Sequence, residues 1–317
     1  MTASPRVYVL HENPEWFPPL KSAFDLEGVE VEEVLLVDGH LDLDSPPPPG
    51  VYWSRLSASA HTRGHGTTKE FARAYLSWLE AWGRPVVNGR SVVELEVSKV
   101  AQHALLRVAG FDVPRTTAVF GREGLPAAAA SFPAPFITKH NQGGKGLGVR
   151  RFDSHDEFDR YVASEEFSEP IDGITLVQEF LVSREPFVTR AEFVDGRFVY
   201  AVRVDTTAGS FELCPADACA VPGDDGTTIE LFALRHDITA DSPLIRRYEA
   251  LLAEVGVQIA GIEFLETADG RTVTYDINTN TNYNPDVEAV APVSGPRSIA
   301  RYLGDLLDRE YSSAAVR

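Results

Sequence analysis

Two lysines accompany a cluster of glycines in the segment 135–153, PFITKHNQGGKGLGVRRFD. Lys139 ends a short apolar run, and Lys145 lies among the glycines, which are Gly143, Gly144, Gly146 and Gly148. Glycine lets backbone N–H groups approach an anion closely, so this pattern is typical of a polyphosphate-binding loop. The segment predicts a strand, a glycine loop and a second strand. A plain glycine-rich hairpin without a ligand is the alternative.

Two familiar phosphate motifs do not fit this segment. A P-loop has glycine six residues before its lysine and Ser or Thr after it, but Lys139 and Gly146 occupy those positions around Lys145. The dinucleotide fingerprint leads from a strand into a helix, whereas Val149–Phe152 resumes an extended pattern. The segment is therefore expected to be a hairpin flap whose tip closes over phosphates.

A second group of candidate residues carries only oxygen ligands. The segment 260–285, AGIEFLETADGRTVTYDINTNTNYNP, predicts two strands, Ile259–Leu265 and Thr272–Ile277. Because side chains alternate along a strand, Asp276, Asn278 and Asn280 share a face, and Glu263 reaches them from the partner strand. Such a set, without His or Cys, selects Mg²⁺ or Mn²⁺. Carboxylates in an apolar strand pair are costly without a cation, which favours a metal site over a turn-forming run of asparagines.

Two arginines lie on a predicted hairpin. Asp195-Gly196 separates the runs Phe187–Val194 and Arg197–Val204, which is typical of a two-residue turn. In an uninterrupted register Arg190 lies opposite Ala201, and Arg203 is one diagonal step away on the same polar face as Glu192. The other face is then an apolar core of Phe187, Phe193, Phe198, Tyr200, Val202 and Val204. Two guanidiniums suit phosphate or carboxylate oxygens, and pairing of Arg190 with Glu192 is the alternative.

Two further candidates precede the flap. Glu96–Ala109 predicts a helix with Lys99 in its first turn, where a cation is electrostatically unfavourable and indicates an anionic partner. A surface lysine beside acidic neighbours is the alternative. The loop SRLSASAHTRGHG follows a predicted strand, and ligands of open α/β sheets bind beyond the carboxyl ends of strands. Its candidate substrate-binding residues, with a solvated loop as the alternative, are Arg55, His61, Arg63 and His65.

The elements that position these residues begin with strands alternating with helices over about 1–90, which predicts a small parallel α/β domain. Its strands are expected at Arg6–Leu10, Val31–Val37, Val51–Ser54 and Pro85–Val87, and its helices at Pro14–Leu26 and Thr67–Trp82. Around the flap, strands are expected at Thr116–Phe120 and Thr175–Leu181 and a helix at Ser154–Ser164, with connectors at Pro126–Ser131 and Glu169–Gly173.

Composition excludes several classes of protein. With 29 Lys+Arg against 47 Asp+Glu, the net charge is −18, so nucleic acid is not an expected partner. The N-terminus lacks a signal-peptide pattern and no 18-residue apolar run occurs, which predicts a cytoplasmic protein without a membrane anchor. Cys214 and Cys219 have no further ligands at metal-binding spacing and are expected as free thiols.

Taken together, these motifs resemble the ATP-grasp superfamily, most closely the branch of the ribosomal-protein glutamate ligase, with D-alanine–D-alanine ligase and glutathione synthetase more distant. SKVAQHALLRVAGFDVPRT resembles the family segment whose lysine, here Lys99, binds ATP phosphate, and Lys139 resembles the second such lysine. NQGGKGLG is similar to the flap. LVQEFL resembles the strand that meets adenine, and Glu185 in SREPF the ribose-binding carboxylate. Residues implied near the base are Gln178, Glu179, Phe180 and Leu181.

The resemblance also implies roles for the remaining candidates. Arg190 and Arg203 resemble the arginines that steady the transferred phosphate and acyl group, and Glu263, Asp276 and Asn278 match the metal ligands. Asp276 departs from the usual Glu, and NTNTNYNP lengthens the usual Asn-x-Asn-Pro ending. The implied fold class is α/β, with an α+β ATP-binding part, in three domains. These are a parallel-sheet substrate domain (1–95), a lid domain with the flap (96–181) and an antiparallel-sheet domain with the metal site (182–317).

The implied reaction is ATP-dependent amide formation from a carboxylate and an amine, each a small molecule or a peptide, through an acyl phosphate, with ATP and Mg²⁺ as cofactors. No protein nucleophile is needed, which agrees with the lack of a G-x-S-x-G motif. A phosphotransferase on the same scaffold and a non-catalytic nucleotide-binding module are the alternatives. Relatives are often dimers or tetramers, so a homo-oligomer is compatible with the resemblance.

Overall fold

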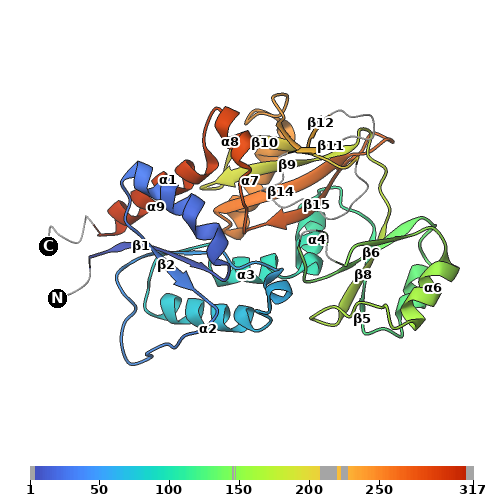
Figure 1. The fold of residues 1–317 in the computed structure, drawn as a ribbon, viewed down its shortest axis with the longest axis horizontal. Helices are drawn as coiled ribbons and strands as arrows, with labels where there is room; N and C mark the ends of the chain where they lie inside the picture. The colour runs from blue at the N-terminus through green and yellow to red at the C-terminus, as the bar shows by residue number, and fades with distance from the viewer. Residues whose placement is uncertain (1–3, 145, 147, 208–219, 223–227, 312–317) are drawn as a thin grey trace.

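The computed structural model describes residues 4–144, 146, 148–207, 220–222 and 228–311 (Figure 1). Lys145, Cys214 and Cys219 lie outside the described residues. The described part contains three main sheets, of which the N-terminal one is parallel and the other two are antiparallel. This arrangement confirms the expected α/β class with a parallel-sheet N-terminal part and an antiparallel-sheet C-terminal part.

The N-terminal sheet has the strand order β2-β1-β3-β4. Its alternating side chains divide between two apolar cores. Val9 and Trp53 face α1 and α9, whereas Leu10 and Tyr52 face α2 and α3. The elements are β1 Arg6–His11, η1 Pro14–Trp16, α1 Phe17–Glu27, β2 Val31–Leu35, β3 Gly50–Ser54, η2 Ala60–Arg63, α2 Thr68–Ala81, β4 Val86–Val87 and α3 Arg90–Glu96. Helix α9 (Gly295–Tyr311), red in Figure 1, lies beside α1 although it ends the chain.

The central sheet has the order β5-β8-β6-β7 and carries the flap. Strands β6 and β7 pair antiparallel as expected, with Phe136 opposite Phe152. Helices α5 and α6 cover one face through an aromatic core. The expected connector at Pro126–Ser131 is wrong, because a short helix forms with proline in its first turn, a position that proline tolerates. The elements are α4 Lys99–Val108, β5 Thr116–Phe120, α5 Leu125–Ala129, β6 Phe136–His140, β7 Arg150–Phe152, α6 His155–Ala163 and β8 Ile174–Glu179.

The C-terminal sheet has the order β13-β10-β9-β14-β15. One face packs on α7 and α4 through a core that includes Phe193, Tyr248 and Phe264. The other face of this sheet lines the cavity that is described below. The elements are β9 Phe187–Val194, β10 Arg197–Asp205, β11 Ala220–Pro222, β12 Thr228–Glu230, β13 Phe232–Leu234, α7 Pro243–Val255, β14 Ile259–Glu266, β15 Thr272–Asn278 and α8 Pro285–Val290.

The hairpin of β9 and β10 confirms the predicted turn but not the predicted register. Asp195 and Gly196 both have positive φ, and Val194 pairs with Arg197. A β-bulge between Phe198 and Tyr200 then shifts the register by one residue. Arg190 therefore lies opposite Val202 rather than Ala201, and Arg203 lies opposite Thr189.

This shift corrects two expectations about faces. Arg203 is exposed on the face opposite to Arg190, so the predicted pair of guanidiniums on one face is wrong. Tyr200, Val202 and Val204 were expected in a core with Phe193, but they share a face with Arg190. Because of the bulge, the side chains of Tyr200, Val202 and Val204 lie where the sequence predicted the guanidinium of Arg203.

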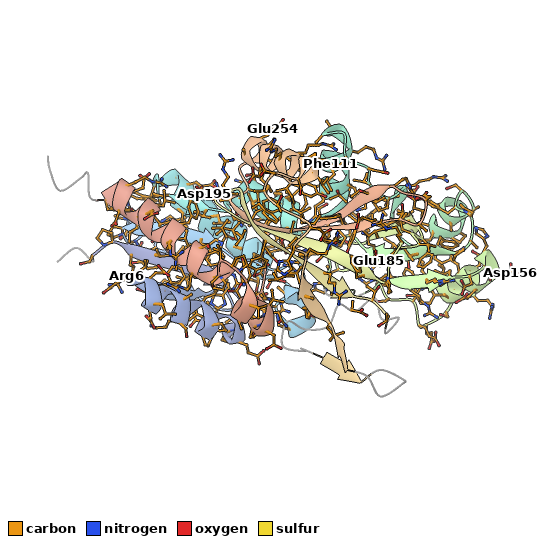
Figure 2. All side chains as sticks on the ribbon, turned by 90° about the horizontal axis from the view of Figure 1, so that it is seen from above. Arg6, Phe111, Asp156, Glu185, Asp195 and Glu254 are labelled. Carbon is orange, nitrogen blue, oxygen red and sulfur yellow. The ribbon has the colours of Figure 1, made fainter. Side chains whose placement is uncertain are left out.

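Helices pack across the domain boundaries that the sequence predicts at 95/96 and 181/182. These boundaries stay predictions. Helix α4 packs on the C-terminal sheet, and α9 packs on the N-terminal sheet. Seen from above, the molecule extends from the N-terminal sheet near Arg6 to α6 near Asp156 (Figure 2). No helix in the described part of the chain is both long enough and apolar enough to cross a membrane.

Candidate active site

A cavity of about 530 Å³ lies between the central sheet, the free face of the C-terminal sheet and the loop after β3. It collects most of the predicted site residues. Those that line it are Lys99, Lys139, Gly143, Gly144, Gly146, Gln178, Glu179, Phe180, Leu181, Arg190, Glu263, Asp276, Asn278 and Asn280. Those that do not are Arg55, His61, Arg63, His65, Glu185 and Arg203.

The free face of the C-terminal sheet presents its side chains in rows that cross the strands. One row runs Asp276, Glu263, Arg190 and Val202 from β15 to β10. The next row runs Asn278, Gly261, Glu192 and Tyr200. Each row therefore begins with an oxygen-bearing side chain on β15 and ends with a largely apolar side chain on β10. The two predicted carboxylates are direct neighbours across one strand pair, as the sequence predicts.

Asn141 brings the two predicted phosphate-binding lysines together. It follows β6, which carries Lys139, and its side-chain oxygen accepts a hydrogen bond from Val100 N at 2.8 Å. Its backbone oxygen accepts from Lys99 N at 3.2 Å. The end of β6 thus caps the start of α4, where Ser98 is the N-cap residue. The predicted anionic partner of Lys99 is within the protein: its Nζ lies 2.7 Å from Oδ1 of Asp276.

The electrostatics of this cluster follow from burial and like charge. Burial and the neighbouring Lys99 lower the pKa of Lys139 to about 7. Burial raises the pKa of Glu263, although Arg190 opposes the shift. Burial alone would raise the pKa of Asp276, but Lys99 and Lys139 outweigh it and hold that pKa below its usual value. Burial and neighbouring charges therefore shift the pKa values of Lys139, Glu263 and Asp276 together, and such clusters of shifted groups are typical of sites that bind ionic ligands.

Arg190 is held in a closed set of contacts. Its Nε lies 2.7 Å from Glu192 Oε1, and its Nη2 donates to Thr281 Oγ1 at 2.6 Å. Thr281 in turn donates to Glu192 Oε2 at 2.9 Å. The guanidinium lies over Gly261, where a Cβ would come within 2.5 Å of Arg190 Nε. Pairing with Glu192, the alternative in the sequence, is thus present, and Arg190 still lines the cavity.

The asparagine-rich segment after β15 continues the strand alternation. Thr279 and Thr281 are buried against the protein, while Asn278, Asn280 and Asn282 line the cavity. Thr279 donates from both N and Oγ1 to Glu96, at 2.7 and 2.8 Å. The segment is therefore an anchored wall and not a free run of turn-forming residues.

The buried Arg55 supports the same wall from the N-terminal sheet. It is 1 % exposed, and its Nη2 donates to the backbone oxygen of Thr281 and to Asn282 Oδ1, both at 2.9 Å. Its guanidinium also lies over the rings of Trp16 and Trp53. Arg55 contacts a cavity-lining residue without lining the cavity, so the expected direct contact with substrate is not supported.

The other candidates in the loop after β3 do not line the cavity. Arg63 pairs with the buried Glu12 at 2.6 Å, and His65 lies 3.9 Å from the same carboxylate. His61 contacts the backbone oxygen of Ala58 at 3.2 Å. Their neighbours Ser57, Ala58 and Ser59 line the cavity instead, together with Trp16. The loop therefore contributes to the cavity wall through its small residues and not through its cations.

The apolar end of the cavity lies where the adenine-binding segment is expected. Leu181 packs with Val188, Val204 and Leu265. Gln178 is buried at the end of β8, and Glu179 Oε1 accepts from Arg115 N at 2.8 Å. Glu185, labelled in Figure 2, is exposed and does not line the cavity, and its contact with ribose stays a prediction.

Sequence reasoning missed Tyr200, Tyr283 and Asn282, which also line the cavity. Tyr200 and Val202 read as core residues because strict alternation hides a bulge. It also missed Gln142, whose Nε2 donates to Ala58 O at 3.3 Å and whose Oε1 accepts from Lys69 Nζ at 2.7 Å. Gln142 therefore connects the flap to the N-terminal part, and its position directly before the glycines was the available signal.

The residues present fit a hard divalent cation. Glu263 and Asp276 are neighbours, and Asn278 Nδ2 donates to Glu263 Oε1 at 3.2 Å. Among the residues that the structure describes, no group of three or more His, Cys, Asp or Glu could hold a metal ion. A cation here would therefore need the Asn278 amide oxygen and oxygens from a ligand, which is the mixed coordination typical of Mg²⁺ with phosphates.

The sequence matches no protein-family model and no curated protein. Solved structures do match. A RimK domain ATP-grasp protein from Sphaerobacter thermophilus is 20% identical with a TM-score of 0.64, covering 94% of this chain and 98% of that one. The ATP-grasp ligase PsnB, complexed with a minimal precursor, is 17% identical with a TM-score of 0.65, covering 95% and 98%. D-cycloserine synthetase DcsG is 18% identical with a TM-score of 0.64, covering 95% and 99%.

Proposed function

We propose that this chain, which has the ATP-grasp fold, is an ATP-dependent carboxylate–amine ligase. The observation that carries the proposal is the meeting of Lys99 and Lys139 with Glu263 and Asp276 in one cavity. Two ammonium groups beside two carboxylates suit a triphosphate and its cation, respectively. The solved structure of PsnB with minimal precursor, Mg and ADP supports the same pair of ligands for this cavity.

The proposed reaction has two steps. An oxygen of the substrate carboxylate attacks the γ-phosphorus of ATP, the bond to the bridging oxygen breaks, and ADP leaves an acyl phosphate. The nitrogen of an amine then attacks the acyl carbon and loses a proton, and inorganic phosphate leaves. Amide formation is thereby driven by ATP, and neither step needs a nucleophile from the protein.

The chain's own residues contribute position and charge. Lys99 and Lys139 neutralise phosphate oxygens, and Arg190, held by Glu192 and Thr281, orients the substrate carboxylate. Glu263, Asp276 and Asn278 would hold Mg²⁺, or Mn²⁺, which supplies further charge neutralisation when bound. Gly143 and Gly144 of the flap line the cavity, and Gly144 lies beside Ser59, so closure of the flap would exclude water, which hydrolyses an acyl phosphate. Arg203 and Glu185 have no part in this proposal because they lie outside the cavity.

The test is ADP release from pairs of amino-acid or peptide carboxylates and amines, with mass detection of the product. We expect release to depend on both substrates. The variant Glu263→Gln is expected to reduce turnover by about 100-fold. Glu266→Gln is the matched control, because Glu266 lies on the same strand, pairs with Arg184 and Arg235, and does not line the cavity.

Two results would contradict the proposal in different ways. A phosphorylated final product formed without an amine would identify a phosphotransferase. Nucleotide binding without turnover, unaffected by Glu263→Gln, would identify a binding module. Undiminished ADP release by Glu263→Gln would refute the assignment of Glu263 to the metal.

A further inference from the structure

The cavity has a second apolar end besides the Leu181 end, where the adenine is expected. Tyr200, Val202 and Val287 form a buried cluster, against which Phe232 and Tyr283 pack. All five side chains line the cavity. Along β10 this cluster adjoins the Leu181 end: Val202 lies opposite Arg190, Val204 lies two residues further on opposite Val188, and Phe232 packs against both clusters. On β9, Arg190 lies between Val188 of the Leu181 end and Glu192, which is opposite Tyr200.

The charged side chains at this second end pair within the protein. Among the described residues, Arg190 and Glu192 line it and pair with each other at 2.7 Å, and Arg190 also lies 3.5 Å from Glu263, its neighbour across β14. Glu288, on α8, accepts hydrogen bonds from the Tyr200 hydroxyl and from Gly295 N, and it does not line the cavity. A charged ligand side chain against Tyr200, Val202 and Val287 would lose its hydration without gaining a free hydrogen-bond partner or a counter-charge, which is unfavourable.

Two buried oxygens at the same end have no hydrogen-bond partner within the described part of the chain. They are Oδ1 of Asn280 and the hydroxyl of Tyr283. Both residues line the cavity, and Thr281, which follows Asn280, binds Arg190. A buried amide oxygen without a donor is costly, so a ligand that supplies N–H donors close to its carboxylate is favoured. An α-ammonium group has this chemistry.

We infer that the carboxylate substrate of the proposed ligase is an α-amino acid with an uncharged, apolar side chain. Its side chain lies against Tyr200, Val202 and Val287, and its ammonium group donates to Asn280 and Tyr283. Its carboxylate points toward Arg190 and the γ-phosphate position. The inference rests on the proposed function, and it narrows the substrate class of the same site.

The test uses hydroxylamine as the amine, because it converts any acyl phosphate into a hydroxamate, whose complex with Fe³⁺ is coloured, without knowledge of the natural amine. Leucine, aspartate, lysine and 4-methylpentanoate are compared as carboxylates, with ADP release measured in parallel. We expect kcat/KM for leucine to exceed that for aspartate or lysine by at least about tenfold. Leucine should also exceed 4-methylpentanoate, which has the same carbon chain without the ammonium group.

Variants separate the two apolar ends. Val202→Thr adds a hydroxyl at the second end and should reduce the preference for leucine over aspartate about fivefold. The matched variant Val204→Thr lies two residues further on the same face and packs at the Leu181 end. It should raise KM for ATP and leave the preference among acids unchanged. Asn280→Ala should reduce the advantage of leucine over 4-methylpentanoate.

Three outcomes overturn the inference: a preference for aspartate or lysine, equal use of leucine and 4-methylpentanoate, or an acid preference unaffected by Val202→Thr. If none of the four acids gives ADP or hydroxamate, turnover does not rank them, and binding then decides the inference, while the ligase function is decided by the wider screen of carboxylates and amines. Calorimetry with the non-hydrolysable analogue AMPPNP and Mg²⁺ should still show leucine binding more tightly than aspartate. Equal or reversed affinities would overturn it.

Discussion

Lys139 is expected to take up a proton when nucleotide binds. Its ammonium group is buried beside Lys99, and its pKa is lowered to about 7 in the ligand-free protein. Phosphate oxygens within contact distance favour the charged form and raise a lysine pKa by about 1–3 units. Above pH 7 the free protein therefore lacks a proton that the complex holds. Because nucleotide binding takes up this proton, nucleotide affinity falls as the pH rises above about 7.

The magnitude follows from the same pKa. At pH 7 about half of the molecules carry an uncharged Lys139, and at pH 8 about nine-tenths do. For a raise of about two units on binding, we expect uptake of about 0.5 proton at pH 7 and about 0.8 at pH 8, with affinity about fivefold lower at pH 8 than at pH 7. His103, close to Lys139, does not interfere, because burial lowers its pKa to about 3 and it stays neutral throughout.

Titration calorimetry with AMPPNP and Mg²⁺ in two buffers of different ionisation enthalpy measures the proton count directly. Lys139→Arg is the control, because a guanidinium stays charged over this range and should abolish the uptake. Subtracting the control removes protons exchanged by the nucleotide itself. Equal uptake by the two proteins at pH 8 would refute the reasoning, and so would an affinity that does not fall with pH.

Three further changes test the architecture of the cavity. Gly261→Ala places a Cβ 2.5 Å from Arg190 Nε and should lower kcat by about tenfold or more, whereas Gly66→Ala, with open space around it, should not; steady-state ADP release compares them. Gln142→Ala removes the flap's hydrogen bond to the N-terminal loop and should raise KM for ATP severalfold with little change in Tm, and an unchanged KM would contradict that role. Arg55→Met leaves two acceptors in the wall after β15 without a donor and should lower the unfolding free energy by about 1–3 kcal/mol in urea denaturation.

The sequence predicted the fold where local signals are strong. Alternating strands and helices indicated the parallel N-terminal sheet, and the Asp195-Gly196 turn was recognised from two residues. The flap hairpin and the pairing of Glu263 with Asp276 followed from glycine chemistry and strand periodicity. These features depend on backbone preferences and on alternation, which are properties of short segments.

The wrong predictions share one physical cause. Each concerns which way a side chain faces, and that depends on a register shift or on distant packing partners that a short segment of sequence does not reveal. The bulge before Tyr200 reverses which residues face the cavity, so Arg203 is outside and Val202 is inside. The cations of the loop after β3 find partners elsewhere: Arg63 pairs with Glu12, and Arg55 binds the wall after β15. Charge and spacing identified the loop, but only packing determines which side of it faces the ligand.

The sequence by itself therefore determined the inventory of the site: two lysines, two carboxylates and a glycine flap, with the strands that carry them. Tertiary structure decided which groups meet, because Lys99 and Asp276 are separated by 177 positions and come within 2.7 Å. It also decided the shape of the second apolar end of the cavity, where Tyr200 and Val202 replace the expected second arginine. Residue types set what chemistry is available, whereas register and burial select which of those residues can perform it.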